Sequence, residues 1–166
     1  FLGLFVETGR IRDGEHVRLK TALREVIERH RPEIRLTPGN NVILAGIEPA
    51  LRGNITQLLA DHGVTVGSQG SVLRRASMAC VALPTCGLAV AESERYLPSL
   101  VGRIQEVLDE LGLGGQEILI RMTGCPNGCA RPYTAEIGFV GRSLGLYELW
   151  LGGSETGARL NKLYRD

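Results

Sequence analysis

The sequence predicts a mixed α/β fold of the α+β class, with two compact regions following one another along 166 residues. Strand-like and helix-like segments alternate along most of the chain, and a Gly- and Ser-containing connector at 64–79 interrupts that alternation. All four cysteines lie after the connector. We therefore expect two domains, 1–66 and 67–166, the second carrying the chemistry.

The first domain has the pattern β-α-β-β-α. An apolar start is typical of a strand, and an apolar face at helical spacing precedes Pro32, which ends the first helix. Gly63 ends the second helix. This order is that of a ferredoxin-like half-repeat, one half of a split βαβ unit. We expect strands at 1–6, 34–36 and 42–47 and helices at 20–30 and 55–62.

The second domain is predicted to be an α/β module. After the connector the pattern becomes helical from Leu88, and Pro98 opens a further helix whose apolar stripe extends to Leu111. A strand then leads directly into the second cysteine pair, and ligands collect at the carboxyl ends of strands in such sheets. We expect strands at 117–122, 135–140 and 147–151 and a last helix starting near Glu155.

Composition limits the classes of function. The net charge is +1 and 43% of the residues are hydrophobic, so bulk charge does not indicate nucleic acid or a membrane surface as partner. No apolar run is long enough for a membrane-spanning helix, and the start does not read as a targeting peptide. Reduced thiols suit the cytoplasm. The strand-like start at Phe1 and the end at Asp166 both suggest a piece cut from a longer protein.

The four cysteines form two tight pairs. Five residues separate Cys80 from Cys86, and three separate Cys125 from Cys129. Gly, Pro, Thr and Asn surround both pairs, which places each pair on a turn. Two such turns brought together would offer one sulfur to each iron of an iron–sulfur cubane.

Three other interpretations of these cysteines were weighed. Disulfides are typical of small secreted chains, and this chain has few cysteines and no signal-like start. Buried free thiols would leave the Gly and Pro residues around both pairs unexplained. A structural zinc site is the strongest alternative, although the spacing of Cys80 and Cys86 is wider than zinc knuckles favour. Spacing alone leaves zinc and an iron–sulfur cluster both open.

Two motifs resemble those of the sulfite and nitrite reductase hemoproteins. The stretch MACVALPTCGLA at 78–89 is similar to the first cluster motif of that family, and RMTGCPNGCARP at 121–132 is similar to the second. Weaker similarity extends to FVETGR at 5–10, LTP at 36–38 and LGG at 151–153, so the resemblance covers essentially the whole chain. It is closest to the later, cluster-bearing part of an assimilatory sulfite reductase.

The resemblance implies two cofactors and their ligands. It implies a [4Fe–4S] cluster held by Cys80, Cys86, Cys125 and Cys129, with Cys129 also bridging to the iron of siroheme. Asn127 is a candidate donor to a cluster sulfide or a siroheme carboxylate, and a plain turn residue is the alternative. Arg131 is a candidate partner of a siroheme carboxylate, and an ion pair with Glu136 is the alternative.

The resemblance also implies an enzyme. Sulfite would be reduced to sulfide by six electrons, delivered by ferredoxin or a flavoprotein subunit. A nitrite reductase of the same architecture and a non-catalytic four-cysteine metal-binding module are the alternatives. In that family the anion-binding basic residues belong to the half that precedes this segment. We therefore expect residues 1–166 alone to be inactive.

Overall fold

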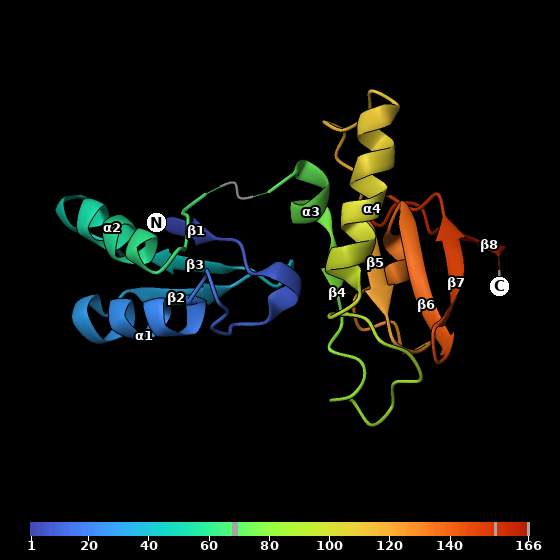
Figure 1. Cartoon of the computed structure of the whole chain (residues 1–166), viewed down its shortest axis with the longest axis horizontal. Helices are drawn as coiled ribbons and strands as arrows, with labels where there is room; N and C mark the ends of the chain where they lie inside the picture. The colour runs from blue at the N-terminus through green and yellow to red at the C-terminus, as the bar shows by residue number, and fades with distance from the viewer. Residues whose placement is uncertain (68–69, 155, 166) are drawn as a thin grey trace. The chain divides into compact units, whose positions relative to one another are not determined.

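The computed structural model describes residues 1–67, 70–154 and 156–165. Its contacts divide the chain into two compact units, Phe1–Gln69 and Gly70–Asp166, which Figure 1 shows in blue to green and in green to red. The mixed α/β fold class predicted from the sequence is confirmed. The expected domain boundary at 66/67 stays a prediction.

The first unit is a three-stranded antiparallel sheet with two helices on one face. The sheet order is β1-β3-β2, and Leu2 pairs with Leu44 while Ile34 pairs with Leu44 from the other side. Apolar residues of β1, β3 and both helices form one buried core, because their apolar positions recur at the period of each element. The elements are β1 (Leu2–Leu4), α1 (Leu19–His30), β2 (Glu33–Leu36), β3 (Val42–Ala45) and α2 (Arg52–Asp61).

The β-α-β-β-α order expected for this unit is therefore confirmed. Strand β2 is its exposed edge, and Leu36 leaves 78% of its surface open to solvent. An apolar groove of about 350 Å³ lies beside this strand, lined by residues that include Leu23, Ile27, Ile34 and Leu36.

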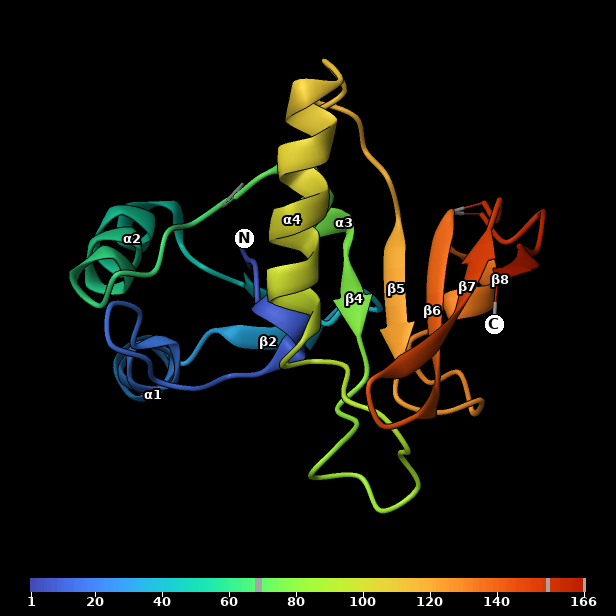
Figure 2. The same ribbon diagram turned by 45° about the vertical axis from the view of Figure 1, so that its right-hand side comes forward.

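The second unit is a five-stranded mixed sheet in the order β4-β5-β6-β7-β8. Strands β4, β5 and β6 are parallel, and β7 and β8 complete the sheet in antiparallel pairing. Helix α4 packs on one face, where Leu97 and Val101 meet Ile120 and Met122 in a buried core (Figure 2). The elements are α3 (Val72–Ala76), β4 (Met78–Ala79), α4 (Leu97–Glu110), β5 (Ile120–Thr123), β6 (Ile137–Ser143), β7 (Leu146–Leu151) and β8 (Lys162–Arg165).

Three expectations for this unit are wrong. The Gly and Ser residues of 64–79 indicated a connector, but this segment contains helix α3 and strand β4. The helix expected from Leu88 is absent, because residues 88–96 form turns whose N–H groups bond to other segments. Glu155, where a last helix was expected to start, lies outside the described residues, and the residues that follow it form bends and strand β8.

The helix near Pro98 is confirmed as α4. Its last turns are less buried than the predicted apolar stripe, which extended to Leu111, indicated. Val107 and Leu111 are 54% and 66% exposed, since the sheet ends before the helix does. Among the described residues, no helix combines the length and apolar character needed to cross a membrane.

Candidate functional site

Both cysteine pairs begin at the carboxyl ends of neighbouring parallel strands. Met78 of β4 pairs with Arg121 of β5, and Ala79 pairs with Met122, so Cys80 lies level with Thr123. Figure 2 shows β4 and β5 pointing the same way, with the following loops at one end of the sheet. The sheet edge that the sequence predicted as a ligand site therefore carries both cysteine loops.

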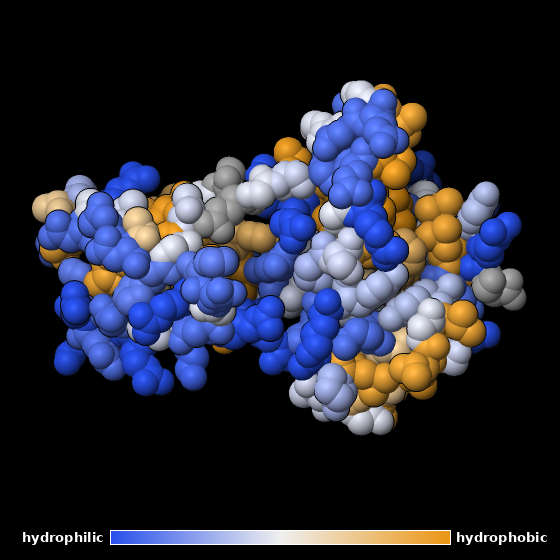
Figure 3. All heavy atoms as spheres, in the orientation of Figure 1, coloured by the Kyte–Doolittle hydropathy of each residue, from blue (hydrophilic) through white to orange (hydrophobic). Residues whose placement is uncertain are grey.

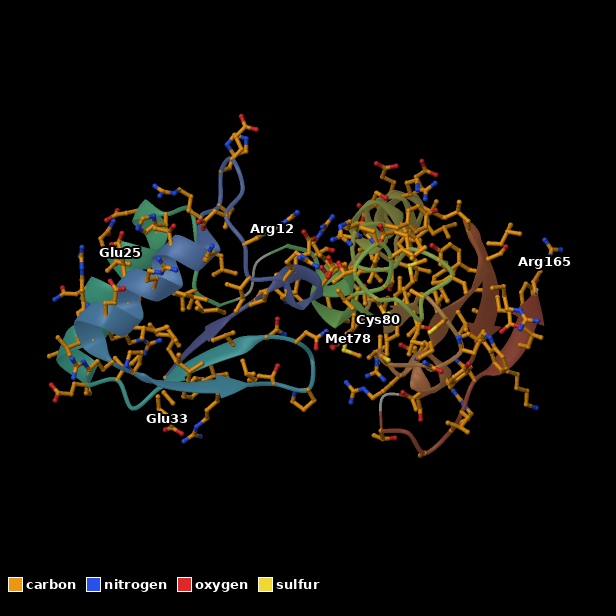
Figure 4. The ribbon with its side chains drawn as sticks, turned by 90° about the horizontal axis from the view of Figure 1, so that it is seen from below. Arg12, Glu25, Glu33, Met78, Cys80 and Arg165 are labelled. Atoms are coloured by element: carbon orange, nitrogen blue, oxygen red, sulfur yellow. The ribbon has the colours of Figure 1, made fainter. Side chains whose placement is uncertain are left out.

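A direct hydrogen bond joins the two loops. The N–H of Gly124 donates to the Sγ of Cys80 at 3.3 Å, and Gly124 is the residue immediately before Cys125. The N–H of Cys80 in turn donates to the Met122 oxygen at 3.1 Å. Figure 4 labels Cys80 beside Met78 at the end of β4. Hydrogen bonds to cysteine sulfurs are one of the features by which proteins tune iron–sulfur clusters.

The first cysteine loop, residues 80–96, is fastened by its own backbone to the end of β5. The N–H groups of Val90 and Ala91 both donate to the Gly124 oxygen, at 2.9 and 3.0 Å. Within the loop, the N–H of Cys86 donates to the Ala82 oxygen at 2.8 Å. The Oγ of Ser93, which is fully buried, donates to the Met122 oxygen at 2.7 Å. The loop is therefore a fixed structure despite having no helix or strand.

The outside of this loop is apolar. Val81, Leu88 and Val90 leave 39%, 70% and 41% of their surfaces exposed. Figure 3 shows orange, hydrophobic surface on the lower part of the second unit. An apolar surface beside thiols lowers the local dielectric constant, which strengthens interactions between charges there.

The second cysteine loop, residues 124–134, is held by polar side chains of β5 and of the segment just before β8. The guanidinium of Arg121 donates to the Arg131 oxygen at 3.4 Å and to the hydroxyl of Thr134. The Nδ2 of Asn161 donates to the oxygens of Pro132 and Ala135, at 2.7 and 3.0 Å. These bonds fix the short 3-10 helix η3 (Pro132–Thr134), which follows the loop's last cysteine.

Gly124 is needed because the first cysteine loop packs closely against it. A Cβ at this position would lie 2.6 Å from the Ala82 Cβ and 2.6 Å from the Ala91 oxygen. Any larger residue would therefore push the first loop away from the end of β5. The local sequence places Gly124 on a turn but does not indicate this packing, since the atoms it meets belong to residues more than thirty positions away.

The four cysteines are all free, and their exposure differs. Cys125 is buried, Cys80 and Cys86 are half-buried, and Cys129 is exposed. Tyr133 lies over this loop, packed edge-on against Trp150 with ring centroids 5.1 Å apart. Burial raises the pKa of the Tyr133 phenol, and Glu148 and Cys125 raise it further, so the ring stays neutral at physiological pH.

The two candidate residues beside the cysteines are both exposed. Asn127 lies on the turn between the two cysteines of the second pair. Arg131 has a φ of 56°, in the left-handed region, and its Nη2 lies 3.7 Å from the Sδ of Met78. Glu136, the alternative partner of Arg131, accepts a hydrogen bond from the Leu119 N–H at 2.9 Å. Their predicted roles stay predictions.

The arrangement is two pairs of thiols at one sheet edge and not a closed cage around one ion. Across residues 1–67, 70–154 and 156–165, no three His, Cys, Asp or Glu side chains gather closely enough to surround a single metal ion. In a cubane each thiolate binds a different iron, so its ligands spread further apart than those of one ion. The set of four free thiols on two turns fits the chemistry of such a cluster, and the ligand assignment stays a prediction.

Sequence reasoning missed residues that hold the loops without touching a thiol. Ser93 and Asn161 are buried polar side chains whose partners lie 29 positions away along the chain. Nothing in their local sequence indicates those partners.

Comparison with known proteins gives consistent results. Residues 1–62 match the family model described as "Nitrite/Sulfite reductase ferredoxin-like half domain". The chain is 55% identical over 163 residues to a Staphylococcus carnosus protein named "Sulfite reductase [NADPH] hemoprotein beta-component", covering 98% of this chain and 29% of that protein. A Bacillus subtilis protein of the same name is 53% identical over 163 residues, covering 98% and 28%.

The solved structures agree. The structure of Mycobacterium tuberculosis NirA protein matches with a TM-score of 0.74 at 27% identity, covering 99% of this chain and 31% of that one. The chain thus spans less than a third of the length of the relatives that it matches. The resemblance to the nitrite/sulfite reductase family that was read from the two cysteine motifs is therefore confirmed by the family model and by the named relatives.

Proposed function

We propose that this chain is the cluster-bearing segment of a sulfite reductase hemoprotein, which reduces sulfite to sulfide by six electrons. The observation that carries the proposal is the pairing of β4 with β5, which brings both cysteine turns to one sheet edge and bonds the Cys80 sulfur to the Gly124 N–H. The names of relatives at 53% to 55% identity support sulfite as the substrate.

Cys80, Cys86, Cys125 and Cys129 are the residues that would hold a [4Fe–4S] cluster. Their thiols are free, and the Gly124 N–H stabilises negative charge on the Cys80 sulfur. When bound, such a cluster coupled to siroheme supplies electrons one at a time. The exposed position of Cys129 supports its assignment as the sulfur shared with siroheme, because a sulfur shared by two metals needs an open side.

Arg131 and Asn127 would orient the second cofactor, siroheme, through its carboxylates. Both are exposed on the loop of the second cysteine pair, where a guanidinium can bind a carboxylate through two parallel hydrogen bonds. The left-handed backbone of Arg131 and the bond from its N–H to the Gly128 oxygen, at 2.7 Å, fix where this side chain starts.

The electron donor of the whole enzyme is proposed to be a separate protein. The relatives are named as the beta-component of an NADPH-dependent enzyme, which supports a partner component that takes electrons from NADPH. We propose that residues 1–166 alone do not reduce sulfite, since they span under a third of those relatives.

Metal analysis tests the cofactor directly. After anaerobic reconstitution with ferrous iron and sulfide, the chain should hold iron and acid-labile sulfide in equal amounts. Its absorption spectrum should show the broad visible band of an iron–sulfur cluster. A single zinc per chain in the purified protein, without sulfide, would instead support the non-catalytic four-cysteine module.

Two cysteine variants separate the roles of the ligands. In the longer protein that carries this segment, Cys129→Ser should uncouple the haem from the cluster, seen as a loss of magnetic coupling between the two. Cys80→Ser is the control, because it should destabilise the cluster itself and lower the iron content. Equal effects of the two substitutions would contradict the bridging role of Cys129.

A further inference from the structure

The hydroxyl of Thr123 is the unexplained polar group of this site. Thr123 ends strand β5, two residues before Cys125, and its side chain is fully buried. Among the described residues its Oγ1 has no hydrogen-bond partner. Buried hydroxyls without partners are rare in native proteins because the lost hydration is not replaced. A group that binds at this position is one explanation for such an atom.

Strand alternation places this hydroxyl on the cysteine side of the sheet. Ile120 and Met122 face α4 in the core, so Arg121 and Thr123 face the opposite side. On β4, Ala79 belongs to the same core as Met122, so Cys80 lies on the face that Thr123 shares. The Cys80 sulfur already accepts a hydrogen bond from the residue next to Thr123.

The backbone acceptors around Thr123 are already in use. The Met122 oxygen accepts bonds from the Cys80 N–H and the Ser93 hydroxyl. The Gly124 oxygen accepts bonds from two N–H groups of the first cysteine loop. Both of these oxygens thus accept two hydrogen bonds each, and the Thr123 hydroxyl has a proton to donate but no partner among the described residues. An anionic sulfur is the acceptor that the proposed cofactor would bring.

We propose that the Thr123 hydroxyl donates a hydrogen bond to an anionic sulfur of the iron–sulfur cluster, either an inorganic sulfide or a cysteine ligand, and so raises the cluster's reduction potential. This inference rests on the proposed function. Hydrogen bonds to sulfur set the potentials of such clusters, because the donated proton stabilises the extra electron of the reduced form.

The first test uses the chain without metal. Thr123→Val keeps the shape of the side chain and removes the unpaired hydroxyl, so the variant should unfold at a higher temperature than the unsubstituted chain. Ser93→Ala is the matched control, since Ser93 is equally buried but its hydroxyl is paired, and this variant should unfold at a lower temperature. If Thr123→Val is destabilised as Ser93→Ala is, the hydroxyl has a structural partner and the inference is wrong.

The second test uses the chain after anaerobic loading with ferrous iron and sulfide. In a redox titration followed by electron paramagnetic resonance, Thr123→Val should show about a tenfold lower ratio of reduced to oxidised cluster at fixed potential, a shift of about 59 mV. Thr123→Ser retains the donor and should match the unsubstituted chain. An unchanged midpoint in Thr123→Val overturns the inference alone, whereas failure of the unsubstituted chain to take up iron and sulfide overturns the proposed function.

Discussion

The two cysteine loops lie at the same edge of one sheet but are stabilised in opposite ways. The first loop, 80–96, is fastened by backbone bonds to the end of β5 and turns apolar side chains outward. The second loop, 124–134, is fastened by the side chains of Arg121 and Asn161. The first therefore depends on how closely two backbones approach, and the second depends on particular polar groups.

This difference means that each loop should fail after a different substitution. Gly124 is the exception, because it starts the second loop, touches the first and donates to the Cys80 sulfur. Substitutions can therefore be ordered by how much of the shared edge each one disturbs.

We expect the largest effect from Gly124→Ala. The new Cβ would meet the Ala82 Cβ and the Ala91 oxygen at 2.6 Å, and overpacking of this kind costs about 3 kcal/mol. Urea unfolding measures the loss, and iron uptake should fall with it because the loops separate. Gly102→Ala in α4 is the control: a Cβ there meets nothing within 4 Å, and helix propensity should raise stability by about 1 kcal/mol. Equal effects of the two substitutions would show that the close approach at Gly124 is unimportant.

Asn161→Ala should have the next largest effect, confined to the second loop. It removes the donor to the Pro132 and Ala135 oxygens in a buried position, which costs about 2 kcal/mol. Amide hydrogen exchange should become faster in residues 125–135 and stay unchanged in residues 82–91. Faster exchange in both loops would contradict their separate attachment.

Arg95→Ala should have a smaller effect on the first loop only. Its Nη1 donates to the Leu83 oxygen at 2.9 Å, and its Nη2 lies 3.4 Å from the Thr85 hydroxyl. The side chain is 39% exposed, so the loss should be about 1 kcal/mol or less. Hydrogen exchange in residues 83–86 provides the measurement. Arg95→Lys keeps the charge without the forked geometry, and full retention of protection in that variant would show that charge alone is sufficient.

The smallest effect at neutral pH should come from Tyr147→Phe. The Tyr147 hydroxyl donates to the Glu92 oxygen at 2.8 Å, near the end of the first loop, and its loss costs about 0.5 kcal/mol. Burial raises the pKa of this phenol, with Tyr96 and Glu92 adding to the shift.

The raised pKa of Tyr147 also predicts how the stability of the chain changes with pH. The folded state favours the neutral phenol. The contribution of Tyr147 to the free energy of unfolding is therefore complete below the pKa of the phenol in the unfolded chain, near 10, and is lost as pH rises through its higher pKa in the folded chain. Unfolding measured from pH 8 to 11 should therefore show a steeper alkaline loss in the unsubstituted chain than in the Phe variant. Parallel curves would show that Tyr147 does not contribute to the alkaline loss.

The sequence predicted the parts of the fold that local periodicity determines. Helix α1 and helix α4 have apolar residues at helical spacing, and strands β5 to β7 have recognisable apolar runs, so all were placed close to their observed positions. Residues 88–91 also look helical, but the N–H groups of Val90 and Ala91 bond to Gly124 more than thirty positions away. A local sequence pattern cannot reveal that these N–H groups bond to a distant oxygen and not within a helix. Strand β8 was missed because it is four residues long and fully exposed.

The candidate site likewise has features that the local sequence predicted and features that it did not. The Gly and Pro residues around the cysteines predicted turns, and the apolar run before Cys125 predicted a strand, which the position of Cys125 after β5 confirms. The contributions of Gly124, Ser93 and Asn161 could not be predicted, since each arises from a partner brought near by the folded sheet.

The uneven exposure of the four thiols has a practical consequence for handling the protein. Cys129 is open to solvent while Cys125 is buried, so an alkylating reagent or dissolved oxygen meets Cys129 first. In air the metal-free chain should cross-link through this residue into disulfide-joined pairs. The rate at which Cys129 is labelled, followed by mass spectrometry, would then report how much of a preparation still has its second loop uncovered.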